Sequence, residues 1–351
     1  MGLQPRDSIV TLFRQIVDIE SVSGNEGPLA DSVEQALRDL PHLAVVRDGD
    51  TLIARTELGR AQRVVIAGHL DTVPVAGNLP SRLVGDLVYG RGSVDMKSGI
   101  AVMLQVAALA TAPSRDVTWI FYDHEEVAAT DNSLNRIAAT RPEALAGDFA
   151  VLMEPTSGRV EGGCQGTLRY RVTLRGRAAH SARSWMGANA IHDAAEVLRR
   201  LVEYTPRSVT VEGLTYREGM NAVEVTGGIA GNVIPDRCTV TVNFRFAPDR
   251  DEADALAHCR ELMAGFDIEF VDFALGARPG LDRPAARDFL AAVGGDPLPK
   301  FGWTDVARFS ALGVPAVNFG PGDPLKAHAD DEACPVSDLR QCRAALLRWL
   351  G

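Results

Sequence analysis

A histidine and an aspartate stand two positions apart in the segment GHLDTVP, residues 68–74, directly after an apolar run from Val64 to Ala67. A short run of β-branched and small apolar residues is typical of a buried strand, which places His69 and Asp71 at its carboxyl end. An imidazole there is either a packed, hydrogen-bonded residue or a ligand for a metal ion. The choice depends on which other residues the fold brings to the same place.

Other segments carry acids or a second histidine at predicted strand ends and turns. Glu125 and Glu126 follow WIFYDH, Glu154 follows AVLM, and His328 lies in the loop beyond AVNFG. Asp95 lies in the turn RGSVDMKSG, ahead of a predicted helix. In open α/β sheets, ligands bind in the crevice outside the carboxyl ends of the strands, so we expect these side chains to meet at one edge.

Each of these residues also has an ordinary structural explanation. Asp95 could cap the helix that follows it. Glu125 and Glu126 could be a solvated pair, and Glu154 a loop carboxylate. His328 could be part of a charged surface with its neighbours Asp330, Asp331 and Glu332. The metal interpretation is favoured because the residues fall together at one sheet edge, which unrelated structural roles would not predict.

The types of ligand indicate which metal would bind. Imidazole mixed with carboxylate suits zinc or a neighbouring first-row ion, whereas calcium and magnesium prefer oxygen ligands. One catalytic zinc uses three protein ligands and keeps an open position, so five ligands are too many for one ion. Two ions about 3.5–4 Å apart that share a carboxylate would use them all.

The elements that position these residues alternate along the first part of the chain. Helical spacing covers 5–20, 28–40 and 97–112, and buried strands are predicted at RVVIAGH, VTWIFY and FAVLMEP. Strands that alternate with helices of this length predict an α/β domain, with a mostly parallel sheet and helices on both faces. The same texture resumes after residue 280, where GVPAVNFG reads as another buried strand.

Between these parts the pattern changes to half-solvated strands. RYRVTLRG alternates polar and apolar residues, and FDIEFVDF closes the region. Between them we predict a helix at 189–203, strands near 222–229 and 237–246, and a helix at 250–264. The order β-α-β-β-α-β is the ferredoxin-like unit. We therefore expect an inserted α+β domain at 165–277 and a catalytic domain at 1–164 and 278–351.

Composition limits the partners and the compartment. The 36 basic and 46 acidic residues give a net charge of −10, which argues against nucleic acid or an anionic membrane as the main partner. The start MGLQPRDSIV lacks the features of a signal peptide, and no apolar run approaches the roughly 18 residues of a membrane span. The five cysteines are scattered without CxxC spacing, so we expect reduced thiols and a cytoplasmic protein.

Five segments together resemble the metal-site motifs of the M20 family of metallo-amidohydrolases, in order and spacing along nearly the whole chain. They are GHLDTVP, YGRGSVDMKSG, YDHEEVA, MEPT and KAHADDE. Residues 161–192 and 216–236 resemble more narrowly the branch of that family, particularly its actinobacterial members, that removes succinyl groups from N-succinyl-diaminopimelate.

The resemblance implies a zinc-peptidase-like domain that holds two zinc ions per chain, with Co²⁺ as a substitute ion. One zinc would be bound by His69, Asp95 and Glu154, and the other by Asp95, Glu126 and His328, so that Asp95 bridges them.

The resemblance also assigns residues around the metals. Asp71 would accept a hydrogen bond from the His69 ring and so fix its tautomer, and the peptide Asp95–Met96 would be cis. Glu125 would be the general base. His180 would reach into the site of a partner subunit and stabilise the oxyanion; as a lone histidine it would be a surface residue.

Substrate carboxylates would be bound by Arg245, Asn232 and Thr304, although Arg245 could also be a solvated strand residue. One departure from the family pattern affects these contacts. Other members of this branch carry an arginine pair where this chain has Cys164 and Gln165, and Arg183 is a candidate to supply the missing charge.

The expected activity is hydrolysis of a linear amide C–N bond, which releases succinate and L,L-2,6-diaminopimelate for lysine and peptidoglycan synthesis. The expected assembly is a homodimer formed through the inserted domain. Two alternatives stay open from the sequence. One is another deacylase of the family, such as acetylornithine deacetylase, an aminoacylase or a dipeptidase. The other is a catalytically dead relative that acts as a binding protein, which the retention of Glu125 and all five ligands disfavours.

Overall fold

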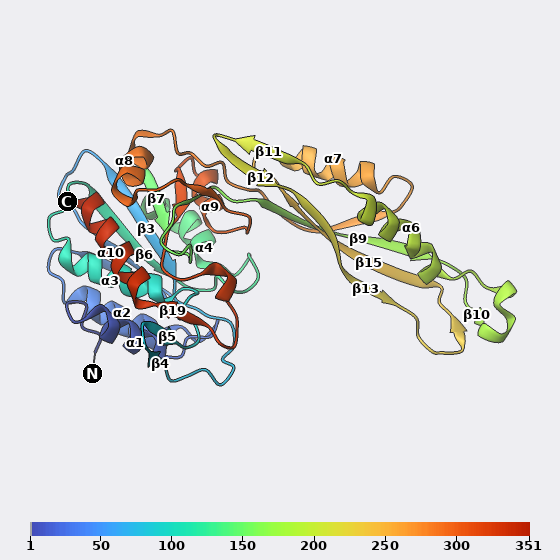
Figure 1. The fold of residues 1–351 in the computed structure, drawn as a ribbon, viewed down its shortest axis with the longest axis horizontal. Helices are drawn as coiled ribbons and strands as arrows, with labels where there is room; N and C mark the ends of the chain where they lie inside the picture. Colours follow the sequence, from blue (N-terminus) through green and yellow to red (C-terminus); the bar gives the residue numbers. More distant parts are fainter. Residues whose placement is uncertain (1) are drawn as a thin grey trace. The chain divides into compact units, whose positions relative to one another are not determined.

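A computed structural model describes residues 2–351, which form two compact units (Figure 1). The first unit contains residues 2–163, Pro279–Leu298 and Asp305–Gly351, and the second contains Cys164–Arg278 and Pro299–Thr304. Residues 299–304 were expected in the catalytic domain but group with the second unit, where Trp303 Nε1 donates a hydrogen bond to Leu275 O at 3.0 Å. Pro299, at the start of this segment, also ends a short strand in the sheet of the first unit.

The first unit is built on an eight-stranded mixed sheet. Its order is β1 (Ala44–Asp48), β2 (Thr51–Arg55), β6 (Asp116–Tyr122), β3 (Arg63–His69), β7 (Phe149–Leu152), β18 (Ala316–Asn318), β8 (Glu161–Gly162) and β17 (Leu298–Pro299). The central strands β6, β3, β7 and β18 pair in parallel, and antiparallel strands flank them. Every residue of β6 is buried, as expected for a central strand covered on both faces.

Five helices share one hydrophobic core with this sheet (Figure 1). They are α1 (Ile9–Asp18), α2 (Gly27–Arg38), α3 (Lys97–Leu109), α8 (Pro284–Val293) and α10 (Val336–Leu350). On β3, Val64 and Ile66 belong to this core, whereas Val65 and Ala67 are buried on the opposite face. Helix α9 (Val306–Ala311) packs against β7 and β18, and α4 (Ser133–Thr140) and α5 (Pro142–Leu145) pack against each other in the same unit.

A small sheet of β4 (Arg82–Val84), β5 (Leu87–Tyr89) and β19 (Ala333–Pro335) completes the unit. Its central strand β5 leads into the turn that carries Asp95, and β19 follows the loop that carries His328. The antiparallel pairing Ala333↔Tyr89 therefore brings those two segments together.

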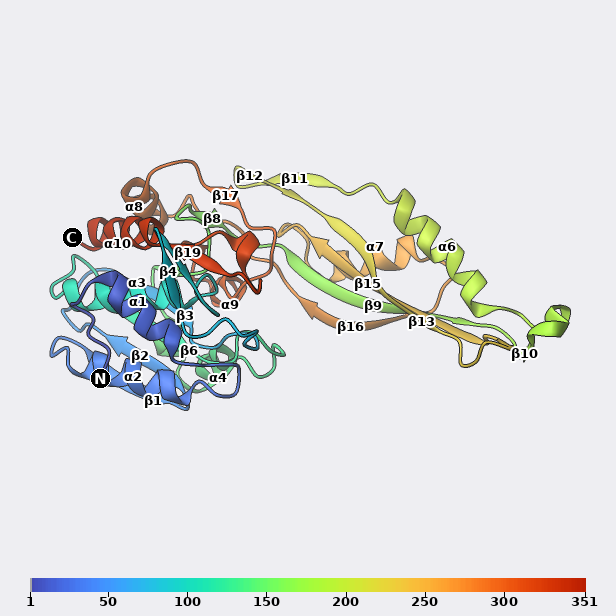
Figure 2. The same ribbon diagram turned by 60° about the horizontal axis from the view of Figure 1, so that its bottom comes forward.

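The second unit contains a four-stranded antiparallel sheet with two helices on one face (Figure 2). The order is β13 (Gly219–Gly227), β15 (Arg237–Phe246), β9 (Gly166–Arg175) and β16 (Ile268–Ala274), and the helices are α6 (Ala190–Glu203) and α7 (Glu252–Leu262). This is the ferredoxin-like connection β-α-β-β-α-β predicted from the sequence. The hairpin of β11 (Ser208–Val211) and β12 (Leu214–Arg217) was not predicted.

One face of that sheet is apolar and the other is polar. Leu168, Tyr170 and Val172 on β9 pack with α6 and α7, while Arg169 and Arg171 point to the other face. Beyond the carboxyl end of β9, the unit also contains β10 (Ala179–His180), the 3₁₀ segment Ser181–Met186 and β14 (Val233–Ile234).

Among the described residues, no helix is long and apolar enough to cross a membrane. All five cysteines are buried and free.

Helix α3 approaches the end of β7 at Gly99. A Cβ added to Gly99 would lie 2.5 Å from Met153 O and 2.8 Å from Met153 Cβ. Gly→Ala inside a helix is normally favourable, but here we expect Gly99→Ala to destabilise the protein by about 1–3 kcal/mol through overpacking. The thermal unfolding midpoint should fall by roughly 2–12 °C.

The matched control is Gly27→Ala at the start of α2, where an added Cβ would make only ordinary contacts of 3.8 Å with Asp50. Its midpoint should be unchanged or slightly higher. Equal midpoints for the two variants would contradict the close approach at Gly99.

Candidate metal centre

The carboxyl ends of three parallel strands meet at one edge of the eight-stranded sheet. On β3 and β6, His69 pairs with Tyr122, and on β3 and β7, Ala67 pairs with Leu152. The segments that continue from these strands, 70–74, 123–126 and 153–154, therefore begin side by side. This register gathers side chains that are far apart in the sequence.

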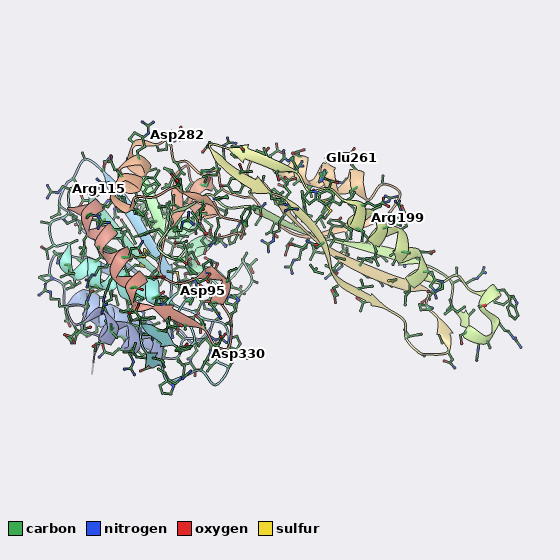
Figure 3. All side chains as sticks on the ribbon, in the orientation of Figure 1. Asp95, Arg115, Arg199, Glu261, Asp282 and Asp330 are labelled. Carbon is green, nitrogen blue, oxygen red and sulfur yellow. The ribbon has the colours of Figure 1, made fainter. Side chains whose placement is uncertain are left out.

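Two histidines converge on the carboxylate of Asp95, which Figure 3 marks in the turn ahead of α3. His69 Nε2 lies 3.1 Å from Asp95 Oδ1, and His328 Nε2 lies 3.4 Å from Asp95 Oδ2. His328 Nε2 also lies 2.9 Å from Glu126 Oε1. The peptide Asp95–Met96 is cis. Each oxygen of one carboxylate thus faces a different imidazole, which is the arrangement that a bridging ligand requires.

Within the described part of the chain, one group of side chains could hold a metal ion. His69, Asp95 and Glu126 offer ligand atoms that all lie within 4.8 Å of one another. Mixed imidazole and carboxylate donors suit zinc or a similar first-row ion. His328 joins this group through its contacts with Asp95 and Glu126.

The electrostatics of the group favour a cation. Burial opposes ionisation of Asp95, but hydrogen bonds from His328 and His69 outweigh it and hold the pKa of the carboxyl well below its usual range. Hydrogen bonds to Asp95 and Glu126 raise the pKa of His328 to about 10. The carboxylates therefore stabilise positive charge strongly, and a divalent ion could take the place of the imidazole protons.

Asp71 contacts the His69 ring through both its main-chain carbonyl and its carboxylate. His69 Nδ1 lies 2.9 Å from the main-chain carbonyl oxygen of Asp71 and 3.5 Å from its Oδ1. The turn after β3 brings the carbonyl closer, and the carboxylate accepts from the main-chain N–H groups of Glu125 (3.0 Å) and Glu126 (2.9 Å). Ser23 Oγ donates to it at 2.7 Å. Asp71 thus orients the imidazole through one group and the two-glutamate loop through the other.

Glu125 and Glu126 have different surroundings although they are adjacent. Glu126 contacts His328, as described above. Burial raises the pKa of Glu125 well above its ordinary value; nearby His69 opposes this rise, whereas Asp305 and Glu154 add to it. The two adjacent glutamates therefore differ in their surroundings, because Glu126 contacts His328 whereas Glu125 lies among other acids and His69.

Glu154 is nearly fully buried, at 6% exposure, just beyond the end of β7. Its charge helps to raise the pKa of Tyr122 and of Glu125, so it lies close to both. Its place among the zinc ligands stays a prediction.

The predicted residues of the inserted domain form two separate groups. His180, Arg183 and Asn232 are exposed at one end of the second unit, where Ser181 N donates to Asn232 O at 2.9 Å. Arg245 and Thr304 lie at the other end. The register of β15 with β9 shows this for Arg245, because Arg237 pairs with Arg175 whereas Arg245 pairs with Thr167. Thr304 O accepts from Cys164 Sγ at 3.7 Å, just before the start of β9.

Arg183 is therefore not a neighbour of Gln165 within this unit. Gln165 is buried and its Nε2 donates to Arg217 O at 2.7 Å. Arg245 is half-buried, and burial lowers the pKa of its guanidinium. Its Nε donates to the neutral Asn243 Oδ1 at 3.1 Å.

A buried network near Glu125 was not predicted from the sequence. The side chains of Tyr122 and Asn132 each donate to Asp305 Oδ2 at 2.9 Å, and Arg308 also contacts Asp305. Asp305 is fully buried. Asp305 directly follows Thr304, a predicted substrate-binding residue, and this proximity in the sequence was the one signal that could have pointed to it. The network connects the loop that carries both glutamates to α9.

Comparison with known proteins extends these observations. The family model described as Peptidase family M20/M25/M40 matches residues 65–351. A Mycobacterium tuberculosis protein, provisionally named succinyl-diaminopimelate desuccinylase DapE, is 51% identical over 352 residues and 99% of both chains. A Corynebacterium glutamicum protein named succinyl-diaminopimelate desuccinylase is 47% identical over 361 residues, covering 100% of this chain and 98% of the other.

Solved structures share the fold at much lower identity. A tripeptidase from Staphylococcus aureus superposes with a TM-score of 0.80 at 18% identity, covering 99% of this chain and 98% of the other. The family match and the full-length identities lead to one conclusion: this chain belongs to peptidase family M20/M25/M40.

Proposed function

We propose that this chain is a two-zinc amidohydrolase that cleaves N-succinyl-L,L-2,6-diaminopimelate into succinate and L,L-2,6-diaminopimelate. The observation that carries the proposal is the placement of Asp95 between His69 and His328, at 3.1 and 3.4 Å. The substrate is supported by the 51% and 47% identities to proteins named as succinyl-diaminopimelate desuccinylases.

The metal centre would use all the predicted ligands. His69, Asp95 and Glu154 would hold one zinc, and Asp95, Glu126 and His328 the other. Bound metals supply a water of lowered pKa and polarise the scissile carbonyl. The donor set of imidazole and carboxylate supports zinc over calcium or magnesium.

Glu125 would move the protons. Its carboxylate takes one proton from the attacking water as the water oxygen bonds to the amide carbon. It then returns that proton to the nitrogen as the C–N bond breaks, so that the amine leaves uncharged. The new oxygen and the second proton of the water stay on the succinyl carboxyl group, which ionises to succinate in solution. The main-chain hydrogen bond from Glu125 N to Asp71 Oδ1, at 3.0 Å, orients the loop for this role.

Arg245 and Thr304 would bind substrate carboxylates, and Asn232 of the partner subunit would join them, because it lies with His180 at the opposite end of the unit. The half-buried Arg245 is the best placed for this, because its cation is partly desolvated and its Nε is bonded to a neutral amide. A carboxylate that pairs with such a guanidinium gains charge-assisted hydrogen bonds.

A homodimer through the second unit would complete the site. Strand β13 is an edge strand that leaves Val223 57% and Val225 51% exposed, and such an edge is a template for pairing with a second copy. His180 lies at the end of the unit remote from Cys164 and Arg278, where the chain enters and leaves it. That position supports a role for His180 in the site of the partner subunit. A biosynthetic role and five free cysteines fit a cytoplasmic enzyme.

The first prediction of the proposed function concerns the substrate. After zinc is removed with a chelator and restored, the protein should release L,L-diaminopimelate from its N-succinyl derivative, and the chelated protein should not. N-acetylornithine should be hydrolysed far more slowly at equal concentration, because it cannot place a second carboxylate on Arg245. Faster turnover of the acetyl substrate would make the chain a deacetylase, and no turnover of either with zinc bound would favour a binding protein.

The second prediction concerns the general base. Glu125→Gln keeps the shape of the side chain but cannot take a proton, so kcat should fall by at least about 10²-fold. The zinc content measured by elemental analysis should match that of the wild type. Loss of zinc from this variant would instead make Glu125 a ligand.

The third prediction concerns His180. If it acts across a dimer, His180→Ala and Glu125→Ala homodimers should each be nearly inactive. Random pairing of the two variants makes half of the dimers mixed, and each mixed dimer has one intact site. Co-refolding equal amounts should therefore recover roughly a quarter of wild-type activity. Mixed dimers that form without any recovery would place His180 in the site of its own chain.

A further inference from the structure

A buried ion pair lies behind the metal centre and has no role in the chemistry proposed above. Arg91 Nη1 lies 3.1 Å from Glu332 Oε2, and the two residues are 3% and 1% exposed. Burying two charges costs more than an exposed pair would return, so such a pair calls for an explanation. Both partners belong to the first unit.

Glu332 holds the turn that carries Asp95. Its Oε1 accepts hydrogen bonds from the main-chain N–H groups of Val94 (2.7 Å) and Asp95 (3.1 Å). Its Oε2 accepts from the N–H of Gly92 (3.1 Å) in addition to Arg91. Every one of these partners is a donor, which matches an ionised carboxylate that can only accept.

Arg91 reaches two other ligand-bearing segments. Its Nε donates to the carbonyl oxygen of Pro74 at 3.0 Å, at the end of the segment that begins with His69 and Asp71. Its Nη1 donates to the carbonyl oxygen of Ala329 at 3.3 Å, one residue beyond His328. The planar guanidinium can hold both contacts and the ion pair at the same time because its donors point in fixed directions.

Glu332 is also four residues beyond His328, on the same segment. Its N–H donates to Ala329 O at 3.2 Å, and its carbonyl oxygen accepts from Gly90 N at 3.1 Å. The pair therefore touches the segments of His69, Asp95 and His328 without contacting any of these three side chains. The side-chain hydrogen bonds of the pair all end on these segments, which a pair that served only the core would not need.

We propose that Arg91 and Glu332 are positioning residues that set the spacing of His69, Asp95 and His328, so that Asp95 can bridge two metal ions. The inference rests on the proposed metal centre but not on the proposed substrate. Removing one acceptor oxygen of Glu332 should let the turn that carries Asp95 shift relative to the two histidines. Metal binding should then weaken, as it generally does when residues that orient metal ligands are mutated.

The test uses zinc affinity, measured by competition with a chromophoric chelator, on full-length protein. Glu332→Gln is nearly isosteric, but its amide nitrogen must face at least one former N–H partner. Zinc should bind this variant about 10- to 100-fold more weakly than wild type. The control is Asp331→Asn, the same charge change one residue away. Asp331 is exposed and pairs only at the surface with Lys326 at 3.2 Å, so its zinc affinity should be unchanged.

A second variant keeps the test informative if Glu332→Gln does not fold. Arg91→Lys keeps the charge but loses the planar set of guanidinium N–H donors, and it should weaken zinc binding in the same way. The metal-free unfolding midpoint is measured for every variant. The proposal would be overturned if a folded Glu332→Gln variant bound zinc as tightly as wild type, or if Asp331→Asn weakened zinc binding equally. It would also be overturned if neither Arg91→Lys nor Glu332→Gln folded, because the pair would then serve to stabilise the fold. A wild-type protein that binds no zinc would instead contradict the proposed function.

Discussion

Like charges gathered at one sheet edge repel one another unless cations lie among them, and this constraint governs the structure around Asp95. Asp71, Asp95, Glu125, Glu126 and Glu154 all follow strand ends or turns at that edge. The carboxylates of Asp95 and Glu126 stabilise positive charge strongly, since their hydrogen bonds with His328 raise the pKa of that imidazole to about 10. Two divalent ions would satisfy the same carboxylates and leave Glu125 to move protons.

The fold provides this edge through parallel pairing and through main-chain hydrogen bonds. The register of β3 with β6 and β7 starts three ligand-bearing segments side by side. Buried carboxylates then fix the segments: Asp71 accepts from the N–H groups of Glu125 and Glu126, and Glu332 accepts from those of Val94 and Asp95. The candidate ligands are therefore held in place by two further acids, Asp71 and Glu332. Each of these acids accepts hydrogen bonds from the main chain beside a candidate ligand.

Much of this was predictable from the sequence, for physical reasons that differ by residue. The alternation in RYRVTLRG and the apolar runs before His69 and Glu154 predict the two kinds of sheet, because periodicity reflects which face is buried. The roles of His69, Asp95 and His328 were expected from the order of motifs. The contact of the Asp71 carbonyl with His69, the packing of 299–304 on the second unit, and the burial of Glu332 could not be read in this way. They depend on turn geometry and on contacts between distant segments, which leave no period in the sequence.

Anomalous diffraction at the zinc edge, from crystals of zinc-loaded protein, would show whether Asp95 bridges two metal ions. We expect two peaks about 3.5–4 Å apart, each beside one carboxylate oxygen of Asp95, the first near His69 and the second near His328. A single fully occupied peak, or two peaks of which one does not contact Asp95, would mean that Asp95 is not a bridging ligand.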